Sequence, residues 1–271
     1  MDLHVYKSGT MQDMQAAVAR GYHWHVSGRV GPARLPQMAA KFATLYETEL
    51  SVGQRYRRRQ AGRGVARLFV HPDYRQPVLH WWVLFTDGEH PAREREHELR
   101  DAREKRQRLL FQDNFELLRL QARGGASVWT WRLTREAQAE FSTRITEAVR
   151  RRRDRRVLKQ VVREFHSLPG FRGVRHQVAA LRYHTAGEWR RAGEGDTCPL
   201  LPTRMPPYLR FKSFPTVPMS AVCARLLADE PPYTLEQRYG EARQANARKA
   251  ATASVVIETP AVAPSPELTT A

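Results

Sequence analysis

The dominant spacing of apolar residues changes near Thr134, from the period of two that marks strands to a period of about four. Side chains alternate between the two faces of a strand, whereas residues three or four apart share one face of a helix. The pattern predicts an α+β fold: a mostly antiparallel sheet of about five strands with packed helices, followed by an arginine-rich helical region. The predicted strands are residues 22–30, 65–70, 78–86, 115–121 and 128–133.

The segments between these strands can be predicted from their glycines, their helical spacing and their charge. Gly124-Gly125 supplies the positive φ angles of a tight turn, so the last two strands are expected to form a hairpin. Helical spacing predicts helices over residues 11–20 and 35–49. We expect a cationic loop over residues 55–64, which lack apolar periodicity, and a solvated helical excursion over residues 91–112, which are charged on every side.

Composition divides the chain into four segments. Residues 1–133 hold the predicted sheet domain, and residues 134–192 hold a basic helical domain that begins with Thr134 as an N-cap. Residues 193–249 form a proline-containing extension with weak helical patterns. Residues 250–271 contain neither a basic nor an aromatic residue, so the hypothesis for this segment is a disordered tail.

The chain is strongly basic, with a formal net charge of +17 at pH 7 from 45 basic and 28 acidic residues. Only six of the basic residues are lysines. Arginine binds phosphate through a planar fork and stacks on bases, and clustered cations gain free energy when they release counterions from a polyanion. We therefore expect a nucleic-acid partner, with DNA favoured over RNA. An acidic protein or membrane surface, and an arginine bias of the genome, are the alternatives.

Several function classes find no support in the sequence. No P-loop, no GxGxxG, no GxSxG and no HExxH motif occurs. Cys198 and Cys223 lack the spacing of a disulfide framework or a metal finger. The first 22 residues lack the apolar core of a secretory signal, and no segment approaches the roughly 18 apolar residues of a membrane span. We expect a cytoplasmic protein with no cofactor and no membrane partner, and not an ordinary metabolic enzyme.

Two runs of arginine are the main candidates for the nucleic-acid contact. One belongs to the predicted loop, and the other lies between two predicted helices, where Asp154 is the only carboxylate inside the run. Repulsion between such neighbours persists unless an anion binds. A helix-turn-helix built from residues 154–167 and 174–191 would add residues near the start of its second helix. The candidates are Arg55, Arg57, Arg58, Arg59 and Arg63, then Arg150, Arg151, Arg152, Arg153, Arg155 and Arg156, and then Arg172 and Arg175.

His23-Trp24-His25 places two imidazoles on one side of the first strand, close enough to share a metal ion. Over those three residues the segment resembles the metal-binding motif of the rolling-circle replication and mobilisation nucleases. The resemblance implies a divalent metal, a sheet core and a helix-borne tyrosine that nicks single-stranded DNA. Tyr183 would be that nucleophile, with Tyr46 and Tyr56 as rivals, and His80 would be a third ligand. The simpler interpretation is that both strand histidines face solvent without a metal, and direct phosphate contact is a third.

The strand aromatics also have two interpretations. Trp129 and Trp131 share one side of a strand, as do Tyr22 and Trp24, so either pair could stack on unpaired bases. Large aromatics in sheets are more often core, and we favour that interpretation. The sequence thus predicts a DNA-binding protein, which we place, as a hypothesis, in the replication, maintenance or transfer of a mobile genetic element such as a plasmid. The alternatives are a metal-dependent nicking nuclease and a basic RNA-binding or protein-binding module.

Overall fold

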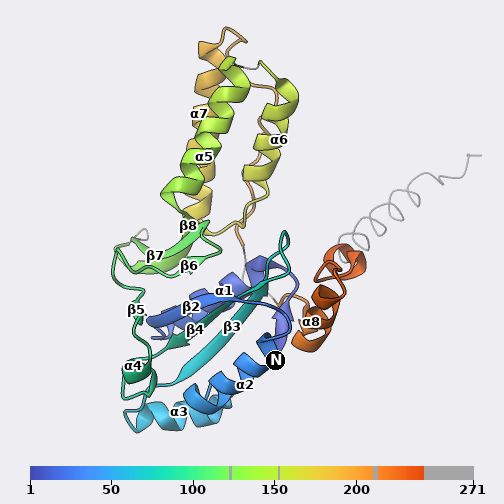
Figure 1. Cartoon of the computed structure of the whole chain (residues 1–271). Helices are drawn as coiled ribbons and strands as arrows, with labels where there is room; N and C mark the ends of the chain where they lie inside the picture. The colour runs from blue at the N-terminus through green and yellow to red at the C-terminus, as the bar shows by residue number, and fades with distance from the viewer. Residues whose placement is uncertain (122–123, 152, 210–212, 241–271) are drawn as a thin grey trace, which may run out of the picture. The chain divides into compact units, whose positions relative to one another are not determined.

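The computed structural model describes residues 1–121, 124–151, 153–209 and 213–240 (Figure 1). The chain divides into two compact units, Met1–Pro232 and Tyr233–Ala271. In the described part of the second unit, Thr234 and Gln237 cap each other's backbone N–H groups at the start of a helical turn. The predicted tail, residues 250–271, lies outside the described residues.

The first unit contains a four-stranded antiparallel sheet. Its elements are, in chain order, β2 Trp24–Val30, α2 Leu35–Tyr46, α3 Val52–Gln60, β3 Ala66–Pro72, β4 Leu79–Phe85, α4 Ala92–Arg95 and β5 Arg100–Asp101. The strand order in the sheet is β3-β4-β2-β5, which is the order of a split β-α-β unit. Three of the five predicted strands are β2, β3 and β4. This arrangement leaves β3 at one edge of the sheet, with α3 immediately before it in the chain.

A second sheet consists of β6 Leu110–Phe111, β7 Phe115–Gln121 and β8 Ser127–Leu133, in that order. β7 and β8 form the predicted hairpin, with Phe115 opposite Leu133. Gly124 and Gly125 have φ angles of 101° and 89°, which residues with a Cβ atom rarely adopt. The α+β fold and its antiparallel pairing are confirmed. The five predicted strands, however, are divided between two sheets.

The segment over residues 91–112 explains this division, and its predicted form is wrong. Its described residues contain one short helix, α4, and otherwise supply β5 to the first sheet and β6 to the second. Ala102, Leu109 and Phe111 are buried. Apolar residues without helical period thus anchor the segment to the core, although the residues between them are charged.

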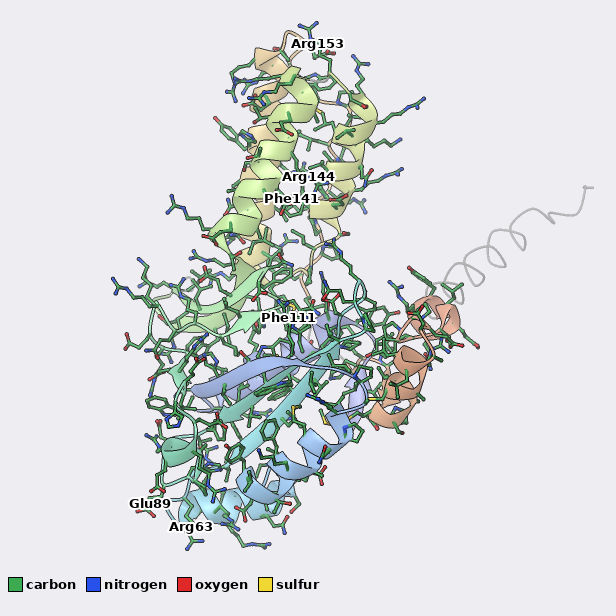
Figure 2. All side chains as sticks on the ribbon, in the orientation of Figure 1. Arg63, Glu89, Phe111, Phe141, Arg144 and Arg153 are labelled. Atoms are coloured by element: carbon green, nitrogen blue, oxygen red, sulfur yellow. The ribbon has the colours of Figure 1, made fainter. Side chains whose placement is uncertain are left out.

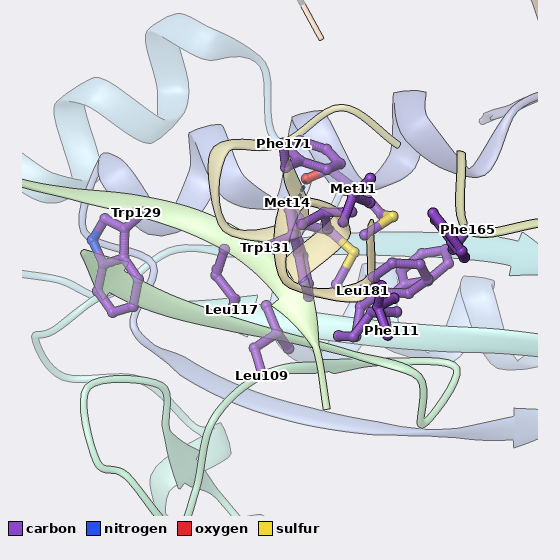
Figure 3. Close-up of a cluster of buried hydrophobic side chains, with 14 of the residues drawn as sticks. Met11, Met14, Leu109, Phe111, Leu117, Trp129, Trp131, Phe165, Phe171 and Leu181 are labelled. Carbon is purple, nitrogen blue, oxygen red and sulfur yellow. Dashed lines mark hydrogen bonds between the residues drawn. The ribbon is translucent and has the colours of Figure 1, made fainter. Parts of the chain in front are cut away.

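Both faces of the four-stranded sheet are covered. On one face, Phe42 and Tyr46 of α2 pack against strand residues. On the other face lies a larger cluster that includes Met11 and Met14 of α1 Lys7–Ala19 and Trp131 of β8 (Figure 3). The indole N–H of Trp131 donates to the carbonyl oxygen of Met11 at 2.8 Å. This bond joins the second sheet to the first helix.

Helices follow β8, as the sequence predicts. They are α5 Arg135–Thr146, which continues as the π-helical segment η1 Glu147–Arg151, then α6 Arg155–His166 and α7 Arg172–Arg191. Thr134 caps α5 by accepting a hydrogen bond from the N–H of Ala137. Phe165 and Leu181 belong to the same core cluster as the second sheet (Figure 3). The first unit is completed by β1 Asp2–His4 paired with β9 Thr216–Pro218, and by α8 Met219–Leu227.

None of the helices in the described ranges combines the length and the apolarity that crossing a membrane requires.

Candidate nucleic-acid interface

Most of the predicted cationic loop is helical, so the expectation for residues 55–64 is wrong over the part that forms α3. Ser51 and Gln54 open this helix as a capping box: Ser51 Oγ accepts from the Gln54 N–H at 3.3 Å, and Gln54 Oε1 accepts from the Ser51 N–H at 2.8 Å. No residue of α3 is buried. Helix prediction from an apolar stripe fails here because arginine forms helices well without one. The Ser-x-x-Gln spacing was the available signal.

One side of α3 lines a groove of about 680 Å³, which we call the arginine groove. Its volume falls within the roughly 300–1,000 Å³ of small-molecule sites. The lining residues of α3 follow the spacing of a single helical face. The remaining lining residues come from the end of α1, from the turn before β2 and from the edge strand β3. Together they are Arg20, Tyr22, Val52, Arg55, Tyr56, Arg59, Gln60 and Arg67.

The four arginines of the groove lack counter-ions. Across the described ranges, none of Arg20, Arg55, Arg59 and Arg67 forms an ion pair with a carboxylate or a side-chain hydrogen bond. The Arg67 guanidinium lies over the ring of Phe69, 4.9 Å from its centroid. Burial lowers the pKa of Arg67, and the charge of Arg55 lowers this pKa further. Tyr22 and Asp13 oppose the shift, and the charge of Arg20 adds a smaller lowering. The groove is therefore a half-buried concentration of positive charge that an anion would stabilise.

The other side of α3 is different. Arg57, Arg58 and Arg63 line a second hollow of about 420 Å³. Arg58 is ion-paired with Glu47, so part of this charge is already neutralised. The five arginines predicted in this segment are thus divided between two surfaces, and two of them enter the groove.

Two groove arginines were missed by the sequence analysis. Arg20 ends a predicted helix and Arg67 belongs to a predicted strand, whereas Tyr22 is a core residue, as favoured above. Each arginine is unremarkable in its own segment, and the two come together with α3 only through the packing of the sheet. The weak signal was Arg67, a charged residue inside an otherwise apolar strand.

The second arginine run spans the end of η1 and the start of α6. Figure 2 places Arg153 at the opposite end of the first unit from Arg63. Asp154 is the only carboxylate inside this run, but the expectation of too few carboxylates nearby is wrong for three of its arginines, because glutamates of η1, of α7 and of the segment after α7 pair with them. Arg152 lies outside the described residues. The ion pairs are Arg150 with Glu188, Arg151 with Glu147 at 3.9 Å, and Arg155 with Glu194 at 2.6 Å.

The start of α7, where a helix-turn-helix would contact DNA, is packed within the protein. A Cβ atom on Gly173 would lie 2.5 Å from the carbonyl oxygen of Trp131 in β8. Arg172 donates to a carbonyl oxygen of β7 at 2.7 Å, and the Arg175 guanidinium lies 3.8 Å from the centroid of the Tyr208 ring. A recognition helix needs this end free to enter a groove of the duplex. Both candidate arginines are instead used in contacts within the chain.

His25 is buried, which corrects the expectation that both strand histidines face solvent. The segment after β5 covers it, and its Nε2 is hydrogen-bonded to the Gln107 carbonyl oxygen at 2.9 Å. Burial lowers the pKa of His25 to about 4, so the ring is neutral at pH 7. His23 is half-buried, with its Nδ1 3.8 Å from a carboxylate oxygen of Asp87.

His80 does not join this pair. The strand register places Leu84 beside His25 and places His80 beside Arg29, four residues further along β2. That separation is about 13 Å at about 3.3 Å per residue, which is too far for one metal ion. His80 Nε2 lies 3.3 Å from Asp73 Oδ2 instead. Over the described ranges, no three His, Cys, Asp or Glu side chains are grouped so that they could hold a metal ion.

The candidate tyrosines also lie apart from the strand histidines. Tyr183 is 78% exposed on α7, about 16 Å along the helix axis from Arg172 at about 1.5 Å per residue, and α7 extends away from both sheets (Figure 1). Tyr46 is buried and donates a hydrogen bond to Glu96. Tyr56 belongs to the arginine groove. The structure therefore does not assemble the residues that the nuclease alternative requires.

Most of the strand aromatics are core residues, as favoured above. Trp129 and Trp131 are buried. Trp24 is half-buried, and the guanidiniums of Arg93 and Arg103 lie over its ring at 4.8 and 5.7 Å from the centroid. These rings offer no free face to a base. Tyr56 of α3, by contrast, is exposed and lines the arginine groove with four arginines.

Comparison with known proteins gives no guide to function. No family model, no curated protein and no solved structure matches this chain. Because a fold alone does not determine function, the chemistry of the arginine groove is the basis on which a function can be assigned.

Proposed function

We propose that this chain is a nucleic-acid-binding protein, that DNA is its partner and that the arginine groove is its phosphate contact. The observation that supports this is the convergence of four guanidiniums from α1, α3 and β3 on one groove in which no described carboxylate pairs with them. Arg55 and Arg59 lie one helical turn apart and repel each other. A bound phosphate replaces that repulsion with charge-assisted hydrogen bonds.

A polyanion fits this surface better than a single small anion. The second hollow extends positive charge from the groove to the other side of α3, where Arg57 is exposed. The net charge of +17 adds a long-range attraction for a negatively charged polymer. Each phosphate that the protein neutralises releases counterions, so binding through this surface must weaken steeply as salt is raised.

The test is fluorescence anisotropy with labelled single-stranded DNA, duplex DNA and RNA of one sequence, measured across a salt series. Replacing Arg55 and Arg59 together by glutamine should weaken DNA binding. It should also lower the slope of log affinity against log salt by about 1.4 to 1.8, because each lost phosphate contact removes about 0.7 to 0.9. The matched control is Arg163→Gln with Arg190→Gln, two exposed arginines outside the groove that remove the same charge.

The control should leave the slope close to that of the wild type. If the groove variant keeps its affinity and slope, or if the control loses as much, the groove is not the phosphate contact. Tighter binding to RNA than to DNA would overturn the choice of DNA as the partner. Absence of binding to all three nucleic acids would overturn the proposed function itself.

A further inference from the structure

The arginine groove contains an aromatic side chain whose ring is accessible. Tyr56 is 65% exposed, although a single exposed aromatic residue is by itself ordinary on a protein surface. Its surroundings distinguish it, because it lines the same groove as four arginines without counter-ions. Tyr183 is similarly exposed but does not line the arginine groove.

The face of α3 that lines the groove carries two parallel rows of side chains. Val52, Tyr56 and Gln60 are spaced four apart and form one row, and Arg55 and Arg59 form the other. One row is uncharged and includes the aromatic ring, whereas the other is cationic. A nucleic-acid strand has the same division, with flat bases along one side and phosphates along the other.

The depth of the groove favours a flexible ligand. Arg55 and Arg67 are half-buried, whereas Arg20 and Arg59 are exposed, so the charged groups lie at different depths. In a duplex the bases are stacked on each other and their faces are closed to protein side chains. In an unpaired strand the bases are free to stack on aromatic side chains, and the backbone can bend towards recessed arginines.

We propose that the arginine groove holds an unpaired nucleotide strand, with one base stacked on the Tyr56 ring and the adjacent phosphates on the Arg55 and Arg59 guanidiniums. This inference rests on the proposed function and adds the kind of nucleic acid that the groove takes. Wild-type protein should therefore bind an oligothymidine of about 12 nucleotides, within the range of single-strand site sizes, more tightly than a duplex of the same length.

The first experiment measures the affinity of Tyr56 variants for that oligothymidine. Tyr56→Ala should weaken binding about 5- to 150-fold, the factor that corresponds to one base stacked on an aromatic ring, and should leave the salt slope unchanged because no phosphate contact is lost. Tyr56→Phe keeps the ring and should stay within about twofold of the wild type. Tyr183→Ala is the matched control and should have no effect. Because α3 has no buried residue and Tyr183 is exposed on α7, these substitutions should leave the fold intact, which circular dichroism checks.

The second experiment removes the bases from the ligand. An abasic strand of the same length keeps every phosphate, so the wild-type protein should bind it more weakly than oligothymidine. Tyr56→Ala should bind the two strands alike, because it has no ring on which a base could stack. If removing the bases from the strand and removing the Tyr56 ring weaken binding by the same factor, the contact is between this tyrosine and a base.

Several results would overturn the inference. They are wild-type affinity in Tyr56→Ala, an equal loss in Tyr183→Ala, a loss by Tyr56→Ala that persists on the abasic strand, and duplex binding as tight as single-strand binding. If one of these occurs while the Arg55 and Arg59 variant still loses affinity, the proposed function stands and only the unpaired-strand inference fails. If the wild type binds no nucleic acid, both fail.

Discussion

At the scale of single residues, the burial of titratable side chains is the property that was hardest to predict from the sequence. His25 of β2 and His71 of β3 are separated in the chain by α2 and α3, and both are buried in the structure. His71 is hydrogen-bonded through Nδ1 to the Thr10 hydroxyl at 3.2 Å. Alternation along a strand identifies which side chains share a face, but it does not say whether a later segment will cover that face.

These two histidines predict how stability changes with pH. Burial lowers the pKa of His25 to about 4 and that of His71 to about 3, below the value of 6.5 in the unfolded chain. The folded state therefore favours the neutral rings, and the stability that they contribute is complete above pH 6.5. It is lost as the pH falls below 6.5, by about 2 kcal/mol for each ring by about pH 5.

Urea unfolding at about pH 7 and about pH 5 measures this loss. His25→Gln should be less stable than the wild type at pH 7 but should lose less free energy of unfolding between the two pH values. Paired carboxylates such as Glu116, whose pKa is lowered despite burial because Arg108 and Arg132 donate to it, titrate below this window. An unchanged difference between pH 7 and pH 5 in the variant would show that His25 does not carry this dependence.

At the scale of elements, strands and apolar helices could be predicted, and the arginine-rich helix could not. The period of two located β2, β3, β4, β7 and β8 because each has at least one covered face. α3 has no buried residue and therefore no apolar period. The division into two sheets was also inaccessible, since it depends on Ala102, Leu109 and Phe111 joining the core, which is a tertiary effect.

The contact between α7 and β8 predicts that Gly173 tolerates no side chain. A Cβ atom there would lie 2.5 Å from the Trp131 carbonyl oxygen and 3.0 Å from Arg132 Cβ, and the first of these is backbone that cannot rotate away. Gly173→Ala should therefore destabilise the protein by about 1 to 3 kcal/mol, the usual cost of overpacking.

Gly187→Ala is the matched control on the same helix. The nearest atoms to an added Cβ there are those of the Arg191 guanidinium, the end of a flexible side chain, at 3.4 Å. This substitution should raise the free energy of unfolding by up to about 1 kcal/mol, because alanine favours a helix interior more than glycine does. Chemical denaturation of both variants tests the pair, and equal effects of the same sign would contradict the close packing of α7 on β8.

At the scale of the whole first unit, charge is concentrated at two ends that differ in their counter-ions. The sequence located both arginine runs, including Arg55 and Arg59 of the groove, because runs are visible in a linear chain. It could not tell that Arg150 and Arg155 of the second run have glutamate partners, because Glu188 and Glu194 approach them only through the folding of α7. The sequence therefore ranked the two runs by local density, whereas the structure ranks them by unpaired charge.

This ranking leads to the last prediction, which compares the two ends by equal charge removal. Arg150→Gln with Arg155→Gln removes two arginines that already have glutamate partners, so the slope of log affinity for DNA against log salt should change by less than about 0.5. The groove variant should change it by about 1.4 to 1.8. The variant at the second run should instead lose thermal stability. Glu188 is buried, and guanidiniums, that of Arg150 among them, lower its pKa against the effect of burial. Without Arg150, the buried carboxylate keeps fewer partners for its charge. Parallel anisotropy and thermal melts separate the two effects: an equal loss of slope at both ends, with no loss of melting temperature at the second run, would show that DNA contacts both.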